Sequence, residues 1–208
     1  MDESVVKHLA PESYDVIMIY DYNNLDFDWS IISNYEKKYI IAWSMGVMCA
    51  TLFDQLNPIS ATAINGTLKP IDNEFGIPTR IYDLTIKGFS PKGKEKFINN
   101  MFSNLEDLPT VNREFEEQKS ELSALKNYKA NLDFKYDKIF ISDNDKIIPT
   151  KNQEAFWSIK ANLKSGHCPF KLFKKWSELL WTKTWFKNGL QKILTLITIM
   201  PKFKKKWL

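Results

Sequence analysis

A single serine stands where an apolar run changes into a segment of helical character. In the stretch YIIAWSMGVMCATLF, residues 39–53, four apolar or small residues lead into Ser44. A sharp strand–turn–helix can hold a serine hydroxyl as an exposed nucleophile. The same position also suits a helix N-cap, in which the hydroxyl accepts a hydrogen bond from a free N–H of the first turn. The pattern leaves both interpretations open.

The candidate base is a histidine. A serine nucleophile needs a base that removes its proton and an acid that orients the base. In hydrolases that are built on a parallel sheet, the three catalytic residues follow the order serine, acid, histidine along the chain. The chain has two histidines: His8 precedes the serine, whereas His167 follows it in the loop-like stretch KSGHCPF. We therefore predict that His167 is the base.

The candidate acid follows a late strand-like run, KIFIS, at residues 138–142. Asp143 and Asp145 come directly after it. Asp145 opens the sequence DKIIP, the usual setting of the orienting carboxylate in this kind of fold, so Asp145 is preferred over Asp143. Either aspartate also has an ordinary interpretation as a turn former or a helix cap. Together with Ser44 and His167, an aspartate here completes the expected order at the ends of the expected elements.

The residues around the serine depart from the G-x-S-x-G pattern of such turns. They read Ala42-Trp43-Ser44-Met45-Gly46, with alanine in the first small position. Alanine still lets a strand and a helix approach closely, so the departure weakens the pattern only mildly.

Apolar runs predict the strands that position these residues. The predicted strands are 14–22, 38–43, 60–66 and 138–142. A helix is predicted over 45–56, and a loop followed by a helix over 143–163. Continuous apolar strands that alternate with helices indicate a parallel sheet covered on both faces. The sequence therefore predicts an α/β fold with a mostly parallel sheet.

The pattern changes between residues 84 and 130, which are helical in character and rich in lysine and glutamate. This segment lies between two predicted core strands. We predict a helical lid over the carboxyl edge of the sheet, where open α/β sheets bind ligands. An ordinary pair of crossover helices is the alternative. The predicted core is then residues 1–83 and 131–180, and residues 181–208 form a basic tail.

Length and composition suit one folded domain. The 208 residues are 44% hydrophobic, with few glycines and prolines. The two cysteines, Cys49 and Cys168, lack the spacing of a metal site or a disulfide framework, which favours a reducing cytoplasm. The first residues lack the apolar core of a signal peptide. We expect a cytoplasmic protein without a metal or a cofactor.

The positive net charge belongs to the C-terminal end. Ten lysines and one acid give residues 171–208 a charge of +9, against +4 for the whole chain, so residues 1–170 carry −5. A nucleic-acid-binding protein would need a basic face on its body, and none is indicated. The tail has the pattern of a basic amphipathic membrane helix, although a membrane partner is not expected for the body.

Several motifs together resemble one family. They are YDYNNLDFDWS, IAWSMGV, TAINGT, FGIP, DNDKIIPTKNQxAFW and GHxPF, in collinear order over residues 1–180. They look like those of the BioG-type pimeloyl-[acyl carrier protein] methyl ester esterases of biotin synthesis. The resemblance implies an α/β-hydrolase with a helical lid that hydrolyses this methyl ester to the free carboxylate and methanol. It implies Ser44 as nucleophile, His167 as base and an aspartate of 143–145 as its orienter.

The same resemblance suggests further roles. The backbone N–H of Met45, the residue after the nucleophile, would hold the oxyanion of the tetrahedral intermediate. Trp43 would line the acyl channel or pack in the core. Carrier proteins are acidic, so cationic lid residues would meet the acyl carrier protein or its phosphopantetheine phosphate. The candidates are Lys87, Lys92, Lys94, Lys96 and Arg113.

Two departures from the family concern the ends of the chain. Members begin with a further strand and a GWG-like loop that would supply a second oxyanion donor, whereas this chain starts at the following segment, MDE. Loss of one donor costs on the order of 100- to 1,000-fold in turnover, so we expect weak activity. A catalytically impaired remnant or binding protein is the alternative function. Residues 181–208, back-translated and read in another frame, resemble the start of a malonyl-carrier-protein methyltransferase of the same pathway, which suggests out-of-frame translation.

Overall fold

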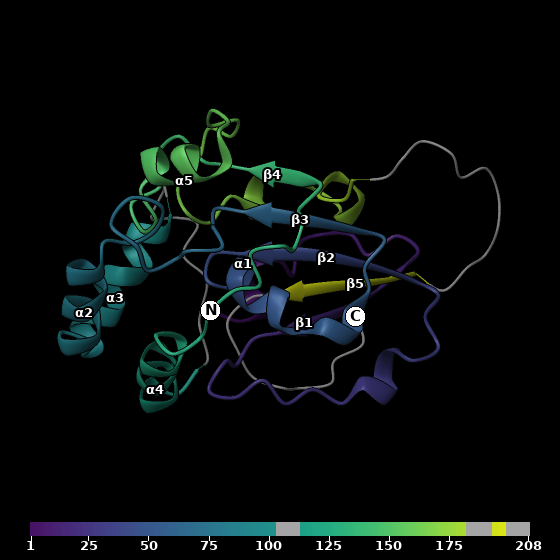
Figure 1. Cartoon of the computed structure of the whole chain (residues 1–208), viewed down its shortest axis with the longest axis horizontal. Helices are drawn as coiled ribbons and strands as arrows, with labels where there is room; N and C mark the ends of the chain where they lie inside the picture. Colours follow the sequence, from purple (N-terminus) through teal and green to yellow (C-terminus); the bar gives the residue numbers. More distant parts are fainter. Residues whose placement is uncertain (103–112, 182–192, 199–208) are drawn as a thin grey trace.

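The fold is built on a five-stranded parallel sheet. The computed structural model describes residues 1–102, 113–181 and 193–198. The strands are β1 (Tyr14–Ile19), β2 (Lys37–Trp43), β3 (Ser60–Ile64), β4 (Lys138–Phe140) and β5 (Ile193–Thr198). They lie in the order β1-β5-β2-β3-β4 (Figure 1). β3 is buried along its whole length, as expected for an inner parallel strand. This is the α/β fold that the sequence predicts.

The register of the sheet brings three strand ends to one edge. Trp43 at the end of β2 pairs with Ile64 at the end of β3, and Ile64 pairs with Phe140 at the end of β4. Because the strands are parallel, the residues that follow them emerge side by side. Ser44 follows β2, and the loop that carries Asp145 follows β4. The sheet itself therefore brings two of the candidates together.

The helix after β2 is shorter than predicted. The sequence predicts one helix over 45–56, but α1 spans only Gly46–Cys49, and two 3₁₀ turns follow, η3 (Ala50–Leu52) and η4 (Asp54–Leu56). The Thr51 hydroxyl donates to the Met48 carbonyl at 2.7 Å, and such a side-chain bond competes with helical pairing of the backbone. Asn57 then adopts a left-handed backbone, with φ 40°, which ends the segment.

In the described residues between β3 and β4, the chain forms three α-helices. They are α2 (Thr79–Lys87), α3 (Pro91–Met101) and α4 (Phe115–Leu125). All three lie beyond the carboxyl ends of the strands (Figure 1), at the place predicted for the lid. α2 begins at Thr79 rather than near residue 84, and the bounds of lid and core as separate units stay a prediction. The other elements are α5 (Thr150–Trp157), η1 (Glu3–Val5), η2 (Trp29–Ile32), η6 (Phe170–Leu172) and η7 (Trp176–Glu178).

Part of the predicted tail belongs to the sheet. β5 lies between β1 and β2 and pairs with both in parallel. For residues 193–198 the prediction of an amphipathic helix is therefore wrong, because the short apolar sequence ILTLIT suits an inner strand. The rest of the tail after Trp181 lies outside the described residues, and its out-of-frame origin stays a prediction. No helix in the described part of the chain has the length and hydropathy needed to span a bilayer.

Candidate active site

Ser44 occupies a strained turn between β2 and α1. Its backbone is left-handed, with φ 59°, which costs a non-glycine residue about 1–3 kcal/mol. The Ser44 N–H donates to the Ile64 carbonyl at 3.0 Å, and the Ser44 carbonyl accepts from the Val47 N–H at 3.1 Å. Met45, not Ser44, is the residue before α1, and its side chain makes no capping bond. The N-cap interpretation of Ser44 is therefore wrong.

The Ser44 hydroxyl faces His167, and His167 faces Asp145. Ser44 Oγ lies 2.8 Å from His167 Nε2, and His167 Nδ1 lies 2.8 Å from Asp145 Oδ2. An ionised carboxylate only accepts hydrogen bonds, so Nδ1 carries the proton and Nε2 accepts from the hydroxyl. His167 is fully buried, and Ser44 is 3% exposed. The three residues form a continuous hydrogen-bonded chain that is shielded from solvent.

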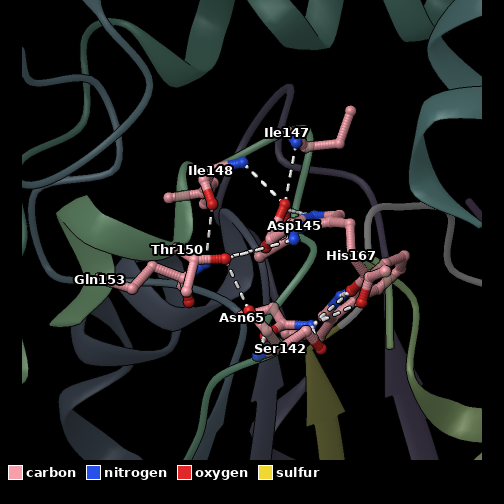
Figure 2. A network of polar contacts seen from close by, with 12 residues as sticks. Asn65, Ser142, Asp145, Ile147, Ile148, Thr150, Gln153 and His167 are labelled. Atoms are coloured by element: carbon pink, nitrogen blue, oxygen red, sulfur yellow. Dashed lines mark hydrogen bonds and ion pairs between the residues drawn. The ribbon is translucent and has the colours of Figure 1, made fainter. Parts of the chain in front are cut away.

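Further donors surround the Asp145 carboxylate (Figure 2). Its Oδ1 accepts from the N–H groups of Ile147 and Ile148, at 2.8 and 3.0 Å. Its Oδ2 accepts from Gln153 Nε2 at 2.8 Å, in addition to His167. These donors occupy both oxygens of the carboxylate and fix its orientation. Asp145 is thus held as an acceptor for the histidine ring.

The two alternative candidates lie elsewhere. Asp143 is exposed, and its Oδ1 accepts from the Ser165 N–H at 3.2 Å. His8 is also exposed, and its Nε2 lies 3.0 Å from the Phe170 carbonyl. The geometry therefore favours Asp145 over Asp143 and His167 over His8. Within the described ranges, no group of three or more His, Cys, Asp or Glu side chains is arranged to hold a metal ion.

Two side chains hold the backbone of His167. Its carbonyl oxygen accepts from Trp43 Nε1 and from Asn65 Nδ2, both at 2.8 Å. Asn65 also donates to Ser142 Oγ at 2.8 Å and accepts from the Ser142 N–H at 2.7 Å. Asn65 thereby ties the ends of β3 and β4 to the histidine loop. The buried Trp43 ring lies against the His167 ring, with centroids 5.3 Å apart, so Trp43 packs in the core.

Sequence reasoning missed the amide side chains of Asn65 and Gln153. Asn65 follows β3 at the same edge of the sheet as Ser44, and that position was a usable signal. Gln153 lies on α5, and nothing in its local pattern distinguishes it from an ordinary helix residue. Its role depends on how α5 packs against the Asp145 loop, which is a long-range property of the fold.

The chain also matches a known protein family over most of its length. The family described as Pimeloyl-ACP methyl esterase BioG matches residues 1–179. The chain belongs to the BioG family. A crystal structure of BioG from Haemophilus influenzae is 32% identical, with a TM-score of 0.75 over 85% of this chain and 88% of that one. This likeness confirms an α/β-hydrolase-like fold for the BioG-family chain.

Two curated proteins are similar to this chain in sequence. An uncharacterized protein of Haemophilus influenzae (strain ATCC 51907 / DSM 11121 / KW20 / Rd) is 32% identical over 190 residues, which is 84% of this chain and 86% of that protein. A malonyl-[acyl-carrier protein] O-methyltransferase of Bacteroides fragilis (strain 638R) is 38% identical over 175 residues. The match covers 78% of this chain but only 35% of the methyltransferase, so the BioG-family chain spans about a third of that relative.

The turn of this BioG-family chain needs a glycine on the neighbouring strand end. A Cβ added at Gly66 would lie 2.3 Å from the Ser44 carbonyl oxygen and 2.6 Å from a methyl group of Val47. Neither distance is compatible with van der Waals contact. Gly66 therefore permits the close approach of the β3 end to the turn that carries the serine.

Gly66→Ala is expected to lower the free energy of unfolding by about 1–3 kcal/mol, because the overpacked backbone has to shift. The shift also displaces Ser44 from His167. Urea unfolding measures the stability change. Gly88→Ala is the matched control, since a Cβ there meets only the Leu84 carbonyl, at 3.1 Å. Equal losses in the two variants would contradict this explanation.

The backbone N–H of Met45 has no hydrogen-bond partner among the residues that the structure describes. In this turn, the Ser44 carbonyl accepts a hydrogen bond from the Val47 N–H. The Met45 carbonyl accepts from the N–H groups of Met48 and Cys49. None of the groups in the described part of the chain accepts from the Met45 N–H. The resemblance to the BioG family predicts this N–H as an oxyanion donor, and that role stays a prediction.

The predicted carrier-protein contacts lie at different depths in the helical segment between β3 and β4. Lys92 is exposed on α3, whereas the Lys94 Nζ donates to the Arg113 carbonyl at 3.1 Å. Arg113 is buried, with its Nη1 3.0 Å from Glu121 Oε2. Burial raises the pKa of Glu121 to about 7 in spite of this ion pair. The expected contact of Arg113 with a carrier protein does not fit this position, because its charge is paired inside the lid.

Helix α3 is bonded directly to the histidine loop. The N–H of Cys168 donates to the carbonyl of Met101, the last residue of α3, at 2.8 Å. Both residues are buried, as are Ser44 and His167. In this BioG-family chain, the residue next to His167 is therefore a point of contact between the candidate site and α3.

Proposed function

We propose that the chain is a serine carboxylesterase that removes the methyl ester from pimeloyl-[acyl carrier protein] in biotin biosynthesis. The products are the free ω-carboxylate and methanol. The observation that carries the proposal is the hydrogen-bonded chain from Ser44 through His167 to Asp145, with 2.8 Å at each step. Membership of a family described as pimeloyl-ACP methyl esterases supports the substrate.

In the first half-reaction, Ser44 Oγ attacks the ester carbonyl carbon, and the hydroxyl proton passes to His167 Nε2. The ring becomes an imidazolium whose Nδ1–H stays bonded to the ionised Asp145. The oxyanion accepts from the Met45 N–H, and one such donor lowers the barrier by about 3 kcal/mol. Collapse of the intermediate expels the methoxy group, which takes the Nε2 proton and leaves as methanol.

In the second half-reaction, water replaces methanol beside His167. Nε2 accepts a proton from the water, whose oxygen attacks the acyl group on Ser44. Collapse of the second intermediate breaks the bond to Ser44 Oγ, which takes the proton from Nε2, and releases the carboxylic acid, which loses its remaining proton to solvent. The far end of the pimeloyl chain stays joined to the carrier protein through both steps.

Exposed lysines of the lid are the proposed contacts with the acidic acyl carrier protein. Lys87 lies on α2, and Lys92 and Lys96 lie on α3; all three are exposed. These helices stand beyond the edge of the sheet that carries Ser44 (Figure 1). Complementary charge of this kind speeds association more than it adds affinity.

The test is hydrolysis of the methyl ester of pimeloyl-[acyl carrier protein]. We expect release of methanol and, by mass spectrometry, a carrier protein that is lighter by one methylene group. Dimethyl pimelate is the matched comparison, because it has the same ester without the carrier. We expect a higher kcat/KM for the carrier-linked ester, and a smaller difference at high ionic strength.

Two results would count against the proposal in different ways. Hydrolysis of dimethyl pimelate without turnover of the carrier-linked ester would contradict the proposed substrate. Turnover of neither ester would contradict the esterase activity itself.

A further inference from the structure

Gln153 is a buried amide that the proposed mechanism leaves unused. It lies on α5 and is fully buried. Its Nε2 donates to Asp145 Oδ2 and to the Ile148 carbonyl, both at 2.8 Å. Its Oε1 has no hydrogen-bond partner among the residues that the structure describes. Because both groups beside Nε2 are acceptors, the amide nitrogen has to face them, and the orientation of the amide is fixed.

We propose that Gln153 is a positioning residue that holds the Asp145 carboxylate in the orientation that His167 requires. The inference rests on the proposed esterase function, which assigns Asp145 the task of orienting the base. Gln153 touches neither Ser44 nor the site of the reacting ester; it acts through Asp145.

The donors around the carboxylate explain why a side chain is needed here. The N–H groups of Ile147 and Ile148 both bind Oδ1. They fix one oxygen, but the carboxylate can still pivot about it. Gln153 binds Oδ2, the oxygen that also accepts from His167 Nδ1. Since an amide does not titrate, this second donor stays in place while His167 gains and loses its proton.

The polar network around α5 holds Gln153 in turn (Figure 2). The Gln153 N–H donates to the Pro149 carbonyl at 3.2 Å. The Thr150 hydroxyl donates to the Ser142 carbonyl at 2.7 Å and accepts from the Asp145 N–H at 3.3 Å. These bonds join the first turn of α5 to the loop that carries Asp145. They therefore hold the Gln153 amide next to the Asp145 carboxylate.

The first test is Gln153→Met, which keeps the length of the side chain but removes the donor. We expect kcat to fall about 10- to 100-fold, the size of one lost hydrogen bond to a charged group, with KM changed less than about 3-fold. We also expect the downfield proton resonance of His167 Nδ1–H to shift or broaden, because Asp145 is then free to move.

Asn152→Leu is the matched control. Asn152 is a buried amide on the same helix, and its Nδ2 donates to the carbonyls of Gly76 and Asn73, at 2.8 and 3.3 Å, rather than to Asp145. This substitution is expected to lower thermal stability and to leave the Nδ1–H resonance of His167 in place.

Gln153→Glu adds a second measurement, the pH dependence of kcat, which a loss of packing alone would leave unchanged. The titratable groups beside the new carboxyl are Asp145 and His167. When ionised, the carboxyl repels Asp145; when protonated, it donates a hydrogen bond as the amide does. The kcat of this variant, divided by that of the wild type, should therefore rise as pH falls. The same ratio for Gln153→Met should not depend on pH.

The proposal is overturned if Gln153→Met keeps the wild-type kcat and resonance. It is also overturned if Gln153→Met and Asn152→Leu lose stability and rate equally while the resonance stays in place. If the wild-type chain hydrolyses no ester, the proposed function fails, and the resonance alone decides whether Gln153 positions Asp145.

Discussion

Replacing Ser44 by alanine is expected to lower the hydrolysis of a pimeloyl methyl ester by about 10⁴- to 10⁶-fold. The hydroxyl that His167 Nε2 contacts at 2.8 Å is then missing, and the base has no nucleophile to activate. Initial rates measure the loss. A fluorophosphonate probe gives an independent measurement, because it adds a fixed mass to an activated serine and should no longer do so.

Two further variants separate this chemistry from damage to the fold. Ser44→Gly accepts the left-handed backbone at this position without strain, so it should lose activity as fully as Ser44→Ala. Ser60→Ala removes another buried hydroxyl, on β3, which has no hydrogen-bond partner among the described residues; it should keep both rate and labelling. Labelling that persists in Ser44→Ala would exclude Ser44 as the nucleophile.

Asp145→Asn is expected to lower kcat by about 10⁴-fold while leaving the backbone in place. The two N–H groups at Oδ1 require an oxygen there. The new amide nitrogen must therefore take the position of Oδ2, where it faces the donors of Gln153 and His167. The ring can avoid this clash only by accepting at Nδ1, which moves its proton to Nε2. The base is then in the wrong tautomer to receive the serine proton.

The control is Asp143→Asn, in which an exposed carboxylate two positions earlier is changed in the same way. Its rate should stay near that of the wild type. Steady-state kinetics on both variants, with circular dichroism to establish folding, make the comparison. A larger loss in Asp143→Asn than in Asp145→Asn would reverse the assignment of the acid.

The proximity of the candidate site residues could be predicted from the sequence because a parallel sheet converts chain order into proximity. Ser44 and Asp145 follow strands whose ends lie in register, so their positions along the chain were enough to place them together. His167 was identified by elimination. The choice between Asp143 and Asp145 rested on one local motif. In the structure, Asp145 Oδ2 lies within hydrogen-bond distance of His167 Nδ1.

The remaining features depend on contacts between distant segments. Nothing near Gln153 in sequence indicates that α5 packs against the acid. The burial of Arg113 depends on Glu121 and on the packing of the lid, whereas its sequence context suggested a surface charge. The pairing of β5 with β1 and β2 joins residues that are far apart in the chain. Such pairing produces no local periodicity in the sequence from which it could be predicted.

The hydrogen bond from the Cys168 N–H to the Met101 carbonyl makes the position of the candidate base depend on a helix outside the sheet edge. Trp43 and Asn65 hold the carbonyl of His167 from the sheet, whereas the last residue of α3 holds the next residue along the chain. A substitution in α3 that displaces Met101 is therefore expected to alter the geometry of the site without changing Ser44, His167 or Asp145.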